Sequence, residues 1–282
     1  MKKITRRSFM AAAGLTVAAL ALTACGGSSS TASSAAASSV ASSAAASSEA
    51  ASAAATELTT VEAGKLTMAT NAAFPPYEMT TDAGEFEGID IETAQAIADK
   101  LGLELQIDDM DFDAALLSVQ QGKADIVMAG VTVTDERKAV MDFSDSYATG
   151  IQSIIVPNDS DIASPDDLAG KKIGTQRGTT GYIYCSDDFG DENVVAYDDG
   201  LTAVQALNNG QVDAVVIDNA PAQEFVAANP GLKVLDTSYA EEDYAIGMAK
   251  GSALEDAVNK ALEELKADGT LQAIVDKYIN AN

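Results

Sequence analysis

Two arginines are the residues of this chain best suited to bind a carboxylate. C-terminal to residue 24, arginine occurs only at positions 137 and 177, and every other cation is a lysine. A planar guanidinium holds a carboxylate through two parallel hydrogen bonds, which a lysine ammonium cannot do. Arg137 ends the segment TVTDER and Arg177 lies in QRGTTG. Each of them either binds an anionic ligand group or forms a structural ion pair with one of the many acidic residues.

The elements that must position these residues follow from the hydrophobic pattern. Short runs rich in β-branched residues predict strands at 65–70, 103–107, 125–129, 151–156, 172–175, 194–197, 214–217 and 244–249. Helical periods predict helices at 89–101, 113–121, 165–168, 180–187, 201–208, 219–229 and 254–267. The alternation predicts an α/β fold with open, largely parallel sheets. Ligands bind outside the carboxyl ends of the strands in such sheets, which makes Gly130, Thr132 and Asp218 candidate site residues.

Two segments share a pattern that suggests two lobes built from similar units. The segments are 121–130 (QGKADIVMAG) and 209–218 (NGQVDAVVID). Each predicts the end of a helix, a glycine in the left-handed conformation, a turn and a buried strand. The match is too short to prove duplication. Helix starts are signalled by a capping sequence at 164–167 and by a capping box from Ser252 to Glu255.

The composition excludes several classes of function. The chain has no histidine, so a Ser-His-Asp triad, a histidine-activated thiol and an imidazole metal site are all impossible. A formal net charge of −26 argues against binding of nucleic acid or of an anionic lipid surface by the folded part. The acid pairs at 108–109 and 187–188 lack the spaced oxygen ligands of a calcium loop. We therefore expect no metal and no cofactor.

The N-terminal region has the pattern of an export signal and a tether. Residues 1–24 contain no acid and combine four cations with an apolar run that is too short to span a membrane. TRRSFM within them resembles the twin-arginine export motif, and a general secretory signal is the alternative. The sequence LTAC resembles a bacterial lipobox, so we expect lipidation of Cys25 and anchoring on the extracytoplasmic face of the cell membrane. The Ser- and Ala-rich composition predicts a disordered tether over 25–60.

Five motifs occur in order along the rest of the chain: ATNAAFPPYE (69–78), EGIDIE (87–92), MDFD (110–113), AGVTVTDER (129–137) and DFS (142–144). Together they resemble the polar amino-acid substrate-binding proteins (solute-binding family 3) of bacterial ABC transporters, from about Gly64 to Tyr278. The resemblance implies a periplasmic-binding-protein-like fold with two lobes that close around a free amino acid. It places two strand-like crossings near 147–151 and 241–245. The first lobe would then comprise 61–147 and 245–282, and the second 151–241.

The resemblance also implies how the ligand's backbone groups are bound. Arg137, helped by Thr132 and the backbone N–H of Thr180, would bind the α-carboxylate. Asp218 would bind the α-ammonium together with the carbonyl of Gly130. A cation and a carboxylate from different lobes recognise a zwitterion only when the lobes meet.

Five further positions would surround the ligand side chain. Phe74 and Phe112 match positions where aromatic rings enclose it. Asn71 stands where some relatives carry an aspartate, often with cationic ligands. Glu78 either supplies that charge here or is a solvated strand residue, and Gln176 sits where relatives vary.

These features predict a monomeric lipoprotein receptor, not an enzyme, that delivers arginine, glutamine or lysine to an ABC permease and its ATPase. Two other functions stay open. An enzyme on the same fold, similar to cyclohexadienyl dehydratases, would need a buried general acid, for which Glu78 is the candidate. A surface lipoprotein in adhesion or signalling would tolerate the loss of Arg137 or Asp218.

Overall fold

The computed structural model describes residues 58–279. The predicted signal peptide, Cys25 and almost all of the predicted tether lie outside these residues. No helix between residues 58 and 279 has the length and apolar character that a membrane span requires.

The first lobe is built on a five-stranded sheet. Its strands are β1 (Lys65–Thr70), β5 (Glu104–Asp109), β6 (Ile126–Val127), β7 (Met141–Phe143) and β14 (Gly247–Ala249). They lie in the order β5-β1-β6-β14-β7. β1 pairs in parallel with β5 and β6, whereas β14 runs antiparallel to β6 and β7. A small antiparallel sheet belongs to the same lobe and consists of β2 (Ala73–Phe74), β3 (Glu78–Thr80) and β4 (Phe86–Glu87).

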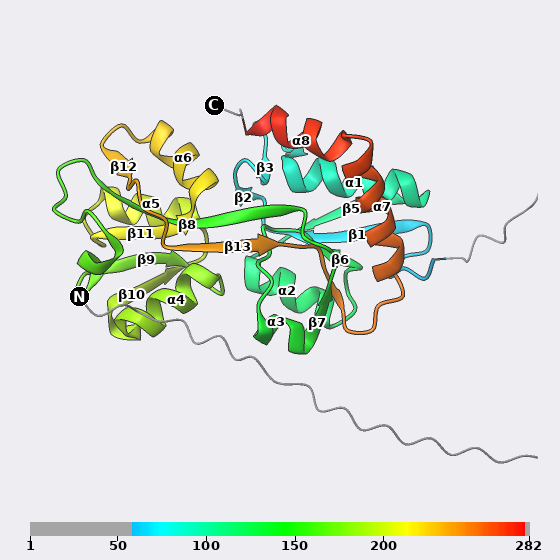
Figure 1. Cartoon of the computed structure of the whole chain (residues 1–282), viewed down its shortest axis with the longest axis horizontal. Coiled ribbons are helices and arrows are strands. Elements are labelled where there is room, and N and C mark those ends of the chain that lie inside the picture. The colour runs from blue at the N-terminus through cyan, green and yellow to red at the C-terminus, as the bar shows by residue number, and fades with distance from the viewer. Residues whose placement is uncertain (1–57, 280–282) are drawn as a thin grey trace, which may run out of the picture. The chain divides into compact units, whose positions relative to one another are not determined.

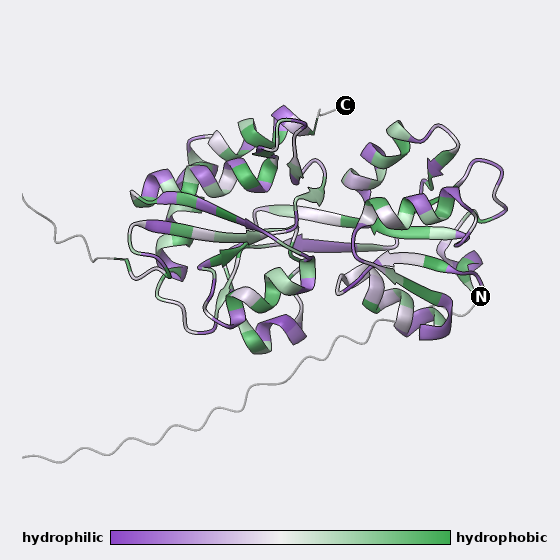
Figure 2. Ribbon diagram, turned by 180° about the vertical axis from the view of Figure 1, so that it is seen from behind, coloured by the Kyte–Doolittle hydropathy of each residue, from purple (hydrophilic) through white to green (hydrophobic). Residues whose placement is uncertain are grey.

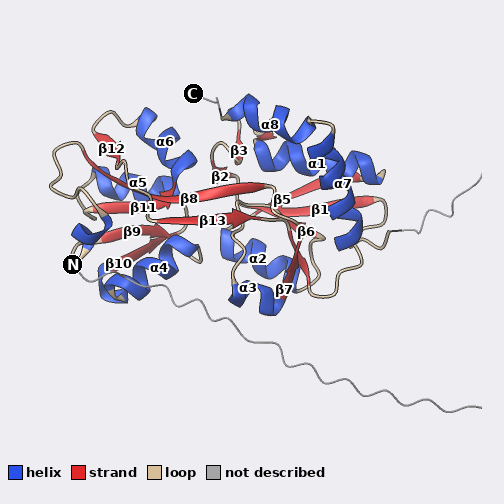
Figure 3. Ribbon diagram, viewed as in Figure 1, coloured by secondary structure: helices blue, strands red, loops and turns tan. Residues whose placement is uncertain are grey.

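Helices cover both faces of this sheet. They are α1 (Ile89–Leu101), α2 (Phe112–Gln120), α3 (Asp135–Val140), α7 (Glu255–Ala267) and α8 (Thr270–Tyr278). Leu66 and Met68 of β1 pack with residues of α1, α7 and α8 on one face. Ala69, which points the opposite way along the strand, packs with α2. Figures 1 and 3 show the two helical layers with the sheet between them.

The second lobe contains a six-stranded sheet. Its strands are β8 (Ala148–Pro157), β9 (Ile173–Gln176), β10 (Val194–Tyr197), β11 (Ala214–Asp218), β12 (Leu232–Val234) and β13 (Ala240–Tyr244). The order is β10-β9-β11-β8-β12, and β13 also pairs with β8. The helices are α4 (Thr180–Phe189), α5 (Gly200–Asn208) and α6 (Asn219–Ala228), with short 3₁₀ turns at η1 (Pro165–Leu168) and η2 (Asp191–Asn193). Residues of α5 and α6 pack on one face of β11, and Cys185 of α4 packs on the other.

Two strands, β8 and β13, connect the lobes. They run antiparallel, with Ala148 opposite Tyr244 and Gln152 opposite Ala240. Each sheet contains one strand that runs against the rest, β14 in the first lobe and β8 in the second. A helix between two strands returns the chain so that the second strand runs parallel to the first. No helix precedes β8 or β14 in this way, because each of them is reached where the chain passes between the lobes. The sheets are therefore mixed, although most strands in each share one direction.

The hydrophobic pattern of the helices explains how they cover the sheets. The buried residues of α7 are Val258, Ala261, Leu262 and Leu265, three or four positions apart on one face. Figure 2 shows hydrophobic residues along the strands of both lobes and a mixed pattern on the helices. The folded part therefore has two layered α/β lobes, as the sequence predicts.

Local signals at helix ends are confirmed in part. Gly122 and Gly210 adopt φ of 65° and 67°, the left-handed conformation expected after α2 and α5. The capping box at Ser164 is present. The predicted capping box at Ser252 is wrong, because α7 begins at Glu255 and Ser252 Oγ instead accepts a 3.2 Å hydrogen bond from the Leu254 N–H.

Candidate functional site

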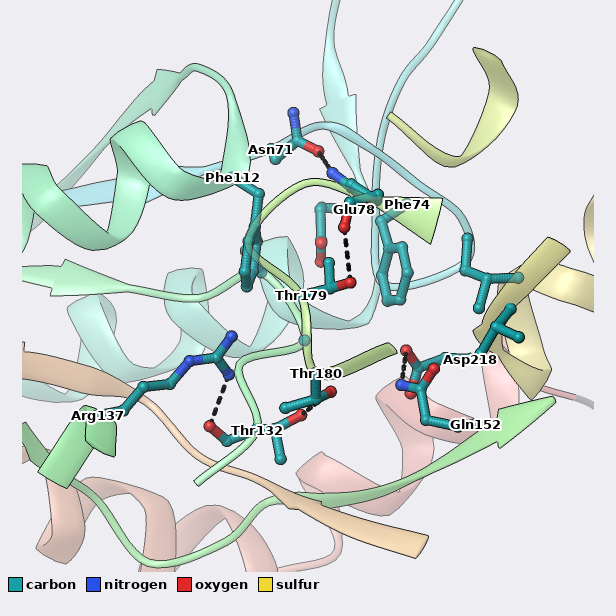
Figure 4. Close-up of a pocket in the computed structure, with 15 residues that line it drawn as sticks. Asn71, Phe74, Glu78, Phe112, Thr132, Arg137, Gln152, Thr179, Thr180 and Asp218 are labelled. Carbon is teal, nitrogen blue, oxygen red and sulfur yellow. Dashed lines mark hydrogen bonds between the residues drawn. The ribbon is translucent and has the colours of Figure 1, made fainter. Parts of the chain in front are cut away.

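One pocket between the two lobes is lined by all ten residues that the sequence predicts to contact a ligand. They are Asn71, Phe74, Glu78, Phe112, Gly130, Thr132, Arg137, Gln176, Thr180 and Asp218. The other lining residues are Ala129, Gln152, Thr179, Val216 and Ile217. Figure 4 shows side chains from both lobes turned toward this space.

The topology brings these residues together because most of them follow the carboxyl ends of strands. Asn71 follows β1, and Gly130 comes shortly after β6. In the second lobe, Gln176 ends β9 and Asp218 ends β11. The carboxyl ends of neighbouring parallel strands meet at one edge of a sheet. The facing edges of the two sheets therefore form the two walls of the pocket.

Arg137 is a buried cation held by carbonyl groups. Its Nη1 donates to the Thr132 carbonyl at 2.8 Å, and Nη2 donates to the Gly178 carbonyl at 3.1 Å. The guanidinium carbon lies 5.4 Å from the centre of the Phe112 ring. Burial lowers the pKa of Arg137, and the charge of Glu242 opposes that shift. No ion pair to Arg137 is formed by any residue from 58 to 279.

Arg177 has the opposite environment. Its side chain is 53% exposed and forms an ion pair with Asp198 at 3.4 Å. The two arginines therefore differ in environment. Arg177 is part of a surface ion pair, whereas Arg137 is a buried cation that points into the pocket.

Asp218 is the buried carboxylate on the second-lobe side of the pocket. Its Oδ2 accepts a 2.8 Å hydrogen bond from Gln152 Nε2, and its Oδ1 accepts one from the Tyr244 hydroxyl. Burial raises the pKa of Asp218 to about 7, although both hydrogen bonds act in the opposite direction. Placing a cation beside Asp218 would favour its charged form.

Glu78 is completely buried at 0% exposure. The interpretation of Glu78 as a solvated strand residue is therefore wrong, because β3 turns this side chain inward behind Phe74. Within residues 58–279, its only hydrogen-bond partner is the carboxyl group of Asp90, and no N–H or hydroxyl donates to it. Burial raises the pKa of Glu78 well above its usual value, and the charge of Asp90 raises it further.

Two aromatic rings flank the space above Glu78. Figure 4 shows Phe112 and Phe74 on two sides of the pocket with Glu78 between them. Phe74 also stacks on Tyr77, with ring centres 5.9 Å apart. Apolar walls with a carboxyl group at the end suit a ligand side chain that has an aliphatic stem and a polar tip.

The structure adds Glu242 to the site, a residue that the sequence analysis did not identify. Its Oε2 accepts hydrogen bonds from Thr180 Oγ1 at 2.9 Å, from Gln152 Nε2 at 3.0 Å and from Thr132 Oγ1 at 3.1 Å. These three donors come from both lobes. The sequence signal that could have shown Glu242 pointing inward is its place two residues from Ala240 and two from Tyr244, since alternate residues of a strand share one face.

Metal ligation has no support in the described part of the chain. Residues 58–279 contain no cluster of His, Cys, Asp or Glu side chains that could hold a metal ion. The thiol of Cys185 is buried, and burial raises its pKa to about 12. Its sulfur therefore has the character of a packed thiol rather than of a reactive thiolate.

The fold and the site together define a class of protein. Two α/β lobes joined by two strands enclose a pocket with a buried cation, a buried carboxylate and two aromatic walls. This is the architecture of a two-lobed periplasmic binding protein.

Comparison with known proteins identifies the family. Residues 66–281 match the bacterial extracellular solute-binding proteins, family 3, and the chain belongs to this family. The L-cystine-binding protein TcyJ of Escherichia coli K12 is 34% identical over 225 residues, 78% of this chain and 85% of TcyJ. The ABC transporter arginine-binding protein 1 of the same organism is 32% identical over 222 residues, 77% of this chain and 91% of that protein.

Solved structures are also similar. An ancestral arginine-binding protein bound to glutamine superposes with a TM-score of 0.73 and 42% identity, covering 77% of this chain and 98% of the ancestral one. A second structure, of an ancestral arginine-binding protein bound to arginine, gives a TM-score of 0.73 and 42% identity, covering 77% of this chain and 99% of that one. Relatives of this chain are thus amino-acid-binding proteins, and they include structures solved with a neutral ligand and with a cationic one.

Proposed function

We propose that the protein is a lipid-anchored extracytoplasmic receptor that captures a free polar amino acid between its lobes and delivers it to an ABC permease. Membership of the solute-binding family supports the transport role. The lipobox at Cys25 supports the anchor on the extracytoplasmic face of the cell membrane. The receptor acts by binding alone and performs no chemistry on its ligand.

The observation that carries this proposal is the placement of Arg137 and Asp218 in one buried pocket on different lobes. Arg137 has carbonyl partners and no carboxylate partner within residues 58–279, so its charge is available to an α-carboxylate. Asp218 is available to an α-ammonium group. Charge-assisted hydrogen bonds are strong where water is excluded, and only a zwitterion can make both sets at once.

Neighbouring groups complete the recognition of the amino-acid backbone. The first N–H groups of α4 at Thr180 lie beside Arg137 and would donate to the α-carboxylate. The Thr132 hydroxyl would donate there as well, by turning away from Glu242 Oε2. The carbonyl of Gly130 would accept from the α-ammonium. A ligand that touches both lobes favours their closed arrangement by its difference in affinity for the closed and open states.

The ligand side chain would lie between Phe74 and Phe112 and end near Glu78, Asn71 and Gln176. All three of these end groups are polar and buried. Asn71 and Gln176 are already bonded to each other, so Glu78 is the group that an apolar side chain would leave without a polar ligand partner. Arginine, glutamine and lysine have the required aliphatic stem and polar tip. The relatives named as arginine-binding, and the two structures of ancestral arginine-binding proteins with glutamine and with arginine, support this choice.

A thermal-shift screen of the soluble chain against the twenty amino acids tests the proposal. A ligand that binds only the folded form at about 100 times its Kd adds about 2.7 kcal/mol to the free energy of unfolding. For a chain of this size we expect Tm to rise by several degrees with the true ligand. The absence of a shift with all twenty amino acids would contradict the proposal.

One observation keeps an enzyme as a second candidate function. Glu78 is buried with a raised pKa, which is the property required of a general acid. A cyclohexadienyl dehydratase would remove water and carbon dioxide from its ring substrate and leave an aromatic product. The aromatic product can be followed by its ultraviolet absorbance, and the carbon dioxide by release of gas. Turnover that is lost in Glu78→Gln would favour this candidate, and binding without turnover would favour the receptor.

A further inference from the structure

The pocket contains more carboxyl groups than a zwitterion can neutralise. Arg137 and Asp218 are matched by the α-carboxylate and the α-ammonium of any amino acid, which adds no net charge. Glu242 does not line the pocket, and three protein donors stabilise its Oε2, although its Oε1 has no hydrogen-bond partner within residues 58–279. Glu78 is left over, with Asp90 as its acidic neighbour. The side-chain end of the site therefore needs either a proton or a cation.

Glu78 and Asp90 form a buried acid pair behind the aromatic walls. Both side chains are 0% exposed. Asp90 Oδ2 accepts from the Gly130 N–H at 3.0 Å and from the Tyr147 hydroxyl at 2.8 Å, so donors from the protein hold this group. Glu78 and Asp90 are hydrogen-bonded to each other through their side chains, a bond that requires a proton between the two carboxyls. Within residues 58–279, no other donor reaches Asp90 Oδ1 or either oxygen of Glu78. Two such carboxyls cannot both carry a charge in a dry environment, so one of them keeps a proton.

The groups that face this pair supply no compensating cation. The charges acting on Glu78 from other elements are Asp90 on α1, Asp109 at the end of β5 and Asp218 at the end of β11. Tyr77 and Tyr147 are the titratable hydroxyls beside the pair, and burial raises the pKa of both. Burial raises the pKa of Asp90 to about 6, while the shift at Glu78 is upward and large. Two protein donors stabilise a charge on Asp90 and none of them reaches Glu78, so we place the shared proton on Glu78.

We propose that the Glu78–Asp90 pair exchanges its proton for the side-chain cation of the ligand, so that a cationic amino acid binds with release of one more proton than a neutral one. This inference rests on the proposed function of the pocket as an amino-acid site. Glu78 is the specificity-determining residue, because its carboxyl lines the pocket. Asp90 acts through Glu78 as a positioning residue.

The proton balance is simple. In the ligand-free protein the proton is on a Glu78 oxygen. When a guanidinium or ammonium group arrives, that O–H bond breaks, the carboxylate pairs with the cation, and the proton leaves to the solvent buffer. A neutral side chain leaves the O–H in place, and the carboxyl group can donate to its oxygen.

Asp218 also releases protons when a ligand binds, and this release must be subtracted from the total to isolate that of Glu78. Burial raises its pKa to about 7, and the α-ammonium of every amino acid favours its ionised form. All ligands therefore release part of a proton from Asp218. Only the difference between a cationic and a neutral ligand reports on Glu78.

Isothermal titration calorimetry of the mature full-length chain, with Cys25→Ser to prevent lipidation, measures this difference. Arginine is compared with citrulline, which has nearly the same shape and an uncharged ureido group. Titrations at pH 6.5 in buffers of different ionisation enthalpy give the number of protons released as the slope of the observed heat. We expect arginine to release about one proton more than citrulline. As pH rises from 5.5 to 7.5, arginine should bind more tightly relative to citrulline, and the ratio of the two Kd values should change by up to about tenfold per pH unit.

The variant Glu78→Gln keeps the shape of the side chain and removes the titrating group. In this variant the proton release with arginine should fall to the citrulline value, and the Kd ratio should become independent of pH. Should Glu78→Gln not fold, the comparison of arginine with citrulline on the unaltered pocket decides the question by itself. If both ligands bind and release the same number of protons, this inference is overturned and the proposed function stays intact. Failure of every amino acid to bind overturns the proposed function and this inference with it.

Discussion

Gln176 of the second lobe donates a 2.8 Å hydrogen bond from Nε2 to Oδ1 of Asn71 in the first lobe. Asn71 in turn donates from Nδ2 to the Met110 carbonyl at 3.0 Å, so its orientation is fixed. The two residues thus join the lobes directly at the side-chain end of the pocket. On the opposite side, Arg137 joins the lobes through the Gly178 carbonyl.

This bond gives a first prediction. Gln176→Ala removes the donor and should weaken amino-acid binding by about tenfold, which corresponds to the loss of one hydrogen bond of about 1.4 kcal/mol. Tm without ligand should change little, because the lobes fold around separate sheets. Calorimetry with the ligand found in the screen measures the Kd. An unchanged Kd would show that the contact between Gln176 and Asn71 contributes nothing to the ligand-bound state.

The two arginines offer a matched pair of variants. Arg177→Ala breaks only a surface ion pair, which is worth about 0–1 kcal/mol, and should leave both Tm and Kd unchanged. Arg137→Lys keeps the charge of the buried site but loses the two-pronged geometry, and should weaken binding by at least tenfold. If both variants bind equally well, the assignment of the α-carboxylate to Arg137 is wrong.

Glu242 should contribute to both stability and affinity. Glu242→Ala leaves Thr132, Gln152 and Thr180 without their shared acceptor, and should lower the free energy of unfolding by about 1–3 kcal/mol. Glu242→Gln retains one acceptor oxygen and should have a smaller effect. Chemical denaturation of the two variants measures the difference. Equal stability of wild type and Glu242→Ala would show that these hydrogen bonds have no net value.

Burial of Glu78 predicts an unusual dependence of stability on pH. Its pKa is raised in the folded state, so the folded protein binds more protons than the unfolded chain above the unfolded pKa. The contribution of Glu78 to the free energy of unfolding therefore falls as pH rises, by up to about 1.4 kcal/mol per pH unit. The difference in free energy of unfolding between Glu78→Gln and wild type should therefore change in favour of the variant as pH rises from 5 to 7.5.

Denaturation of the wild type and of Glu78→Gln at both pH values checks this prediction. Glu241→Gln is the control, because Glu241 is an exposed residue of β13 and this substitution removes the same charge from the surface. If both variants change the pH dependence equally, the effect comes from overall charge and not from burial of Glu78.

The fold was predictable from the sequence to the extent that periodicity marks each element. The span of α1 agrees with the predicted 89–101, since its apolar face and the glycine after it are both clear. The short strands β2, β3 and β4 have two or three residues each, too few for a period to be seen. The predicted strand at 244–249 is divided between the end of β13 and β14, because the chain leaves one sheet and enters the other there.

The site was predictable where a residue type stood out against the composition or matched the family motifs. Arg137 stood out because arginine is rare in this chain, where most cations are lysines, and Asp218 stood out because it ends a buried strand. Glu242 was not visible in this way, because it lies in the acidic run AEEDY, where exposed and buried acids look alike. Its role depends on the alternation imposed by the pairing of β13 with β8, and a pattern of charges does not contain that pairing.

The central claim is that Arg137 and Asp218 together recognise a zwitterionic amino acid. The most direct test is calorimetric titration of Arg137→Ala and Asp218→Ala with the amino acid that shifts the wild-type Tm. We predict that neither variant binds detectably, while circular dichroism and the ligand-free Tm show both lobes folded. Micromolar affinity retained in either folded variant would contradict the account.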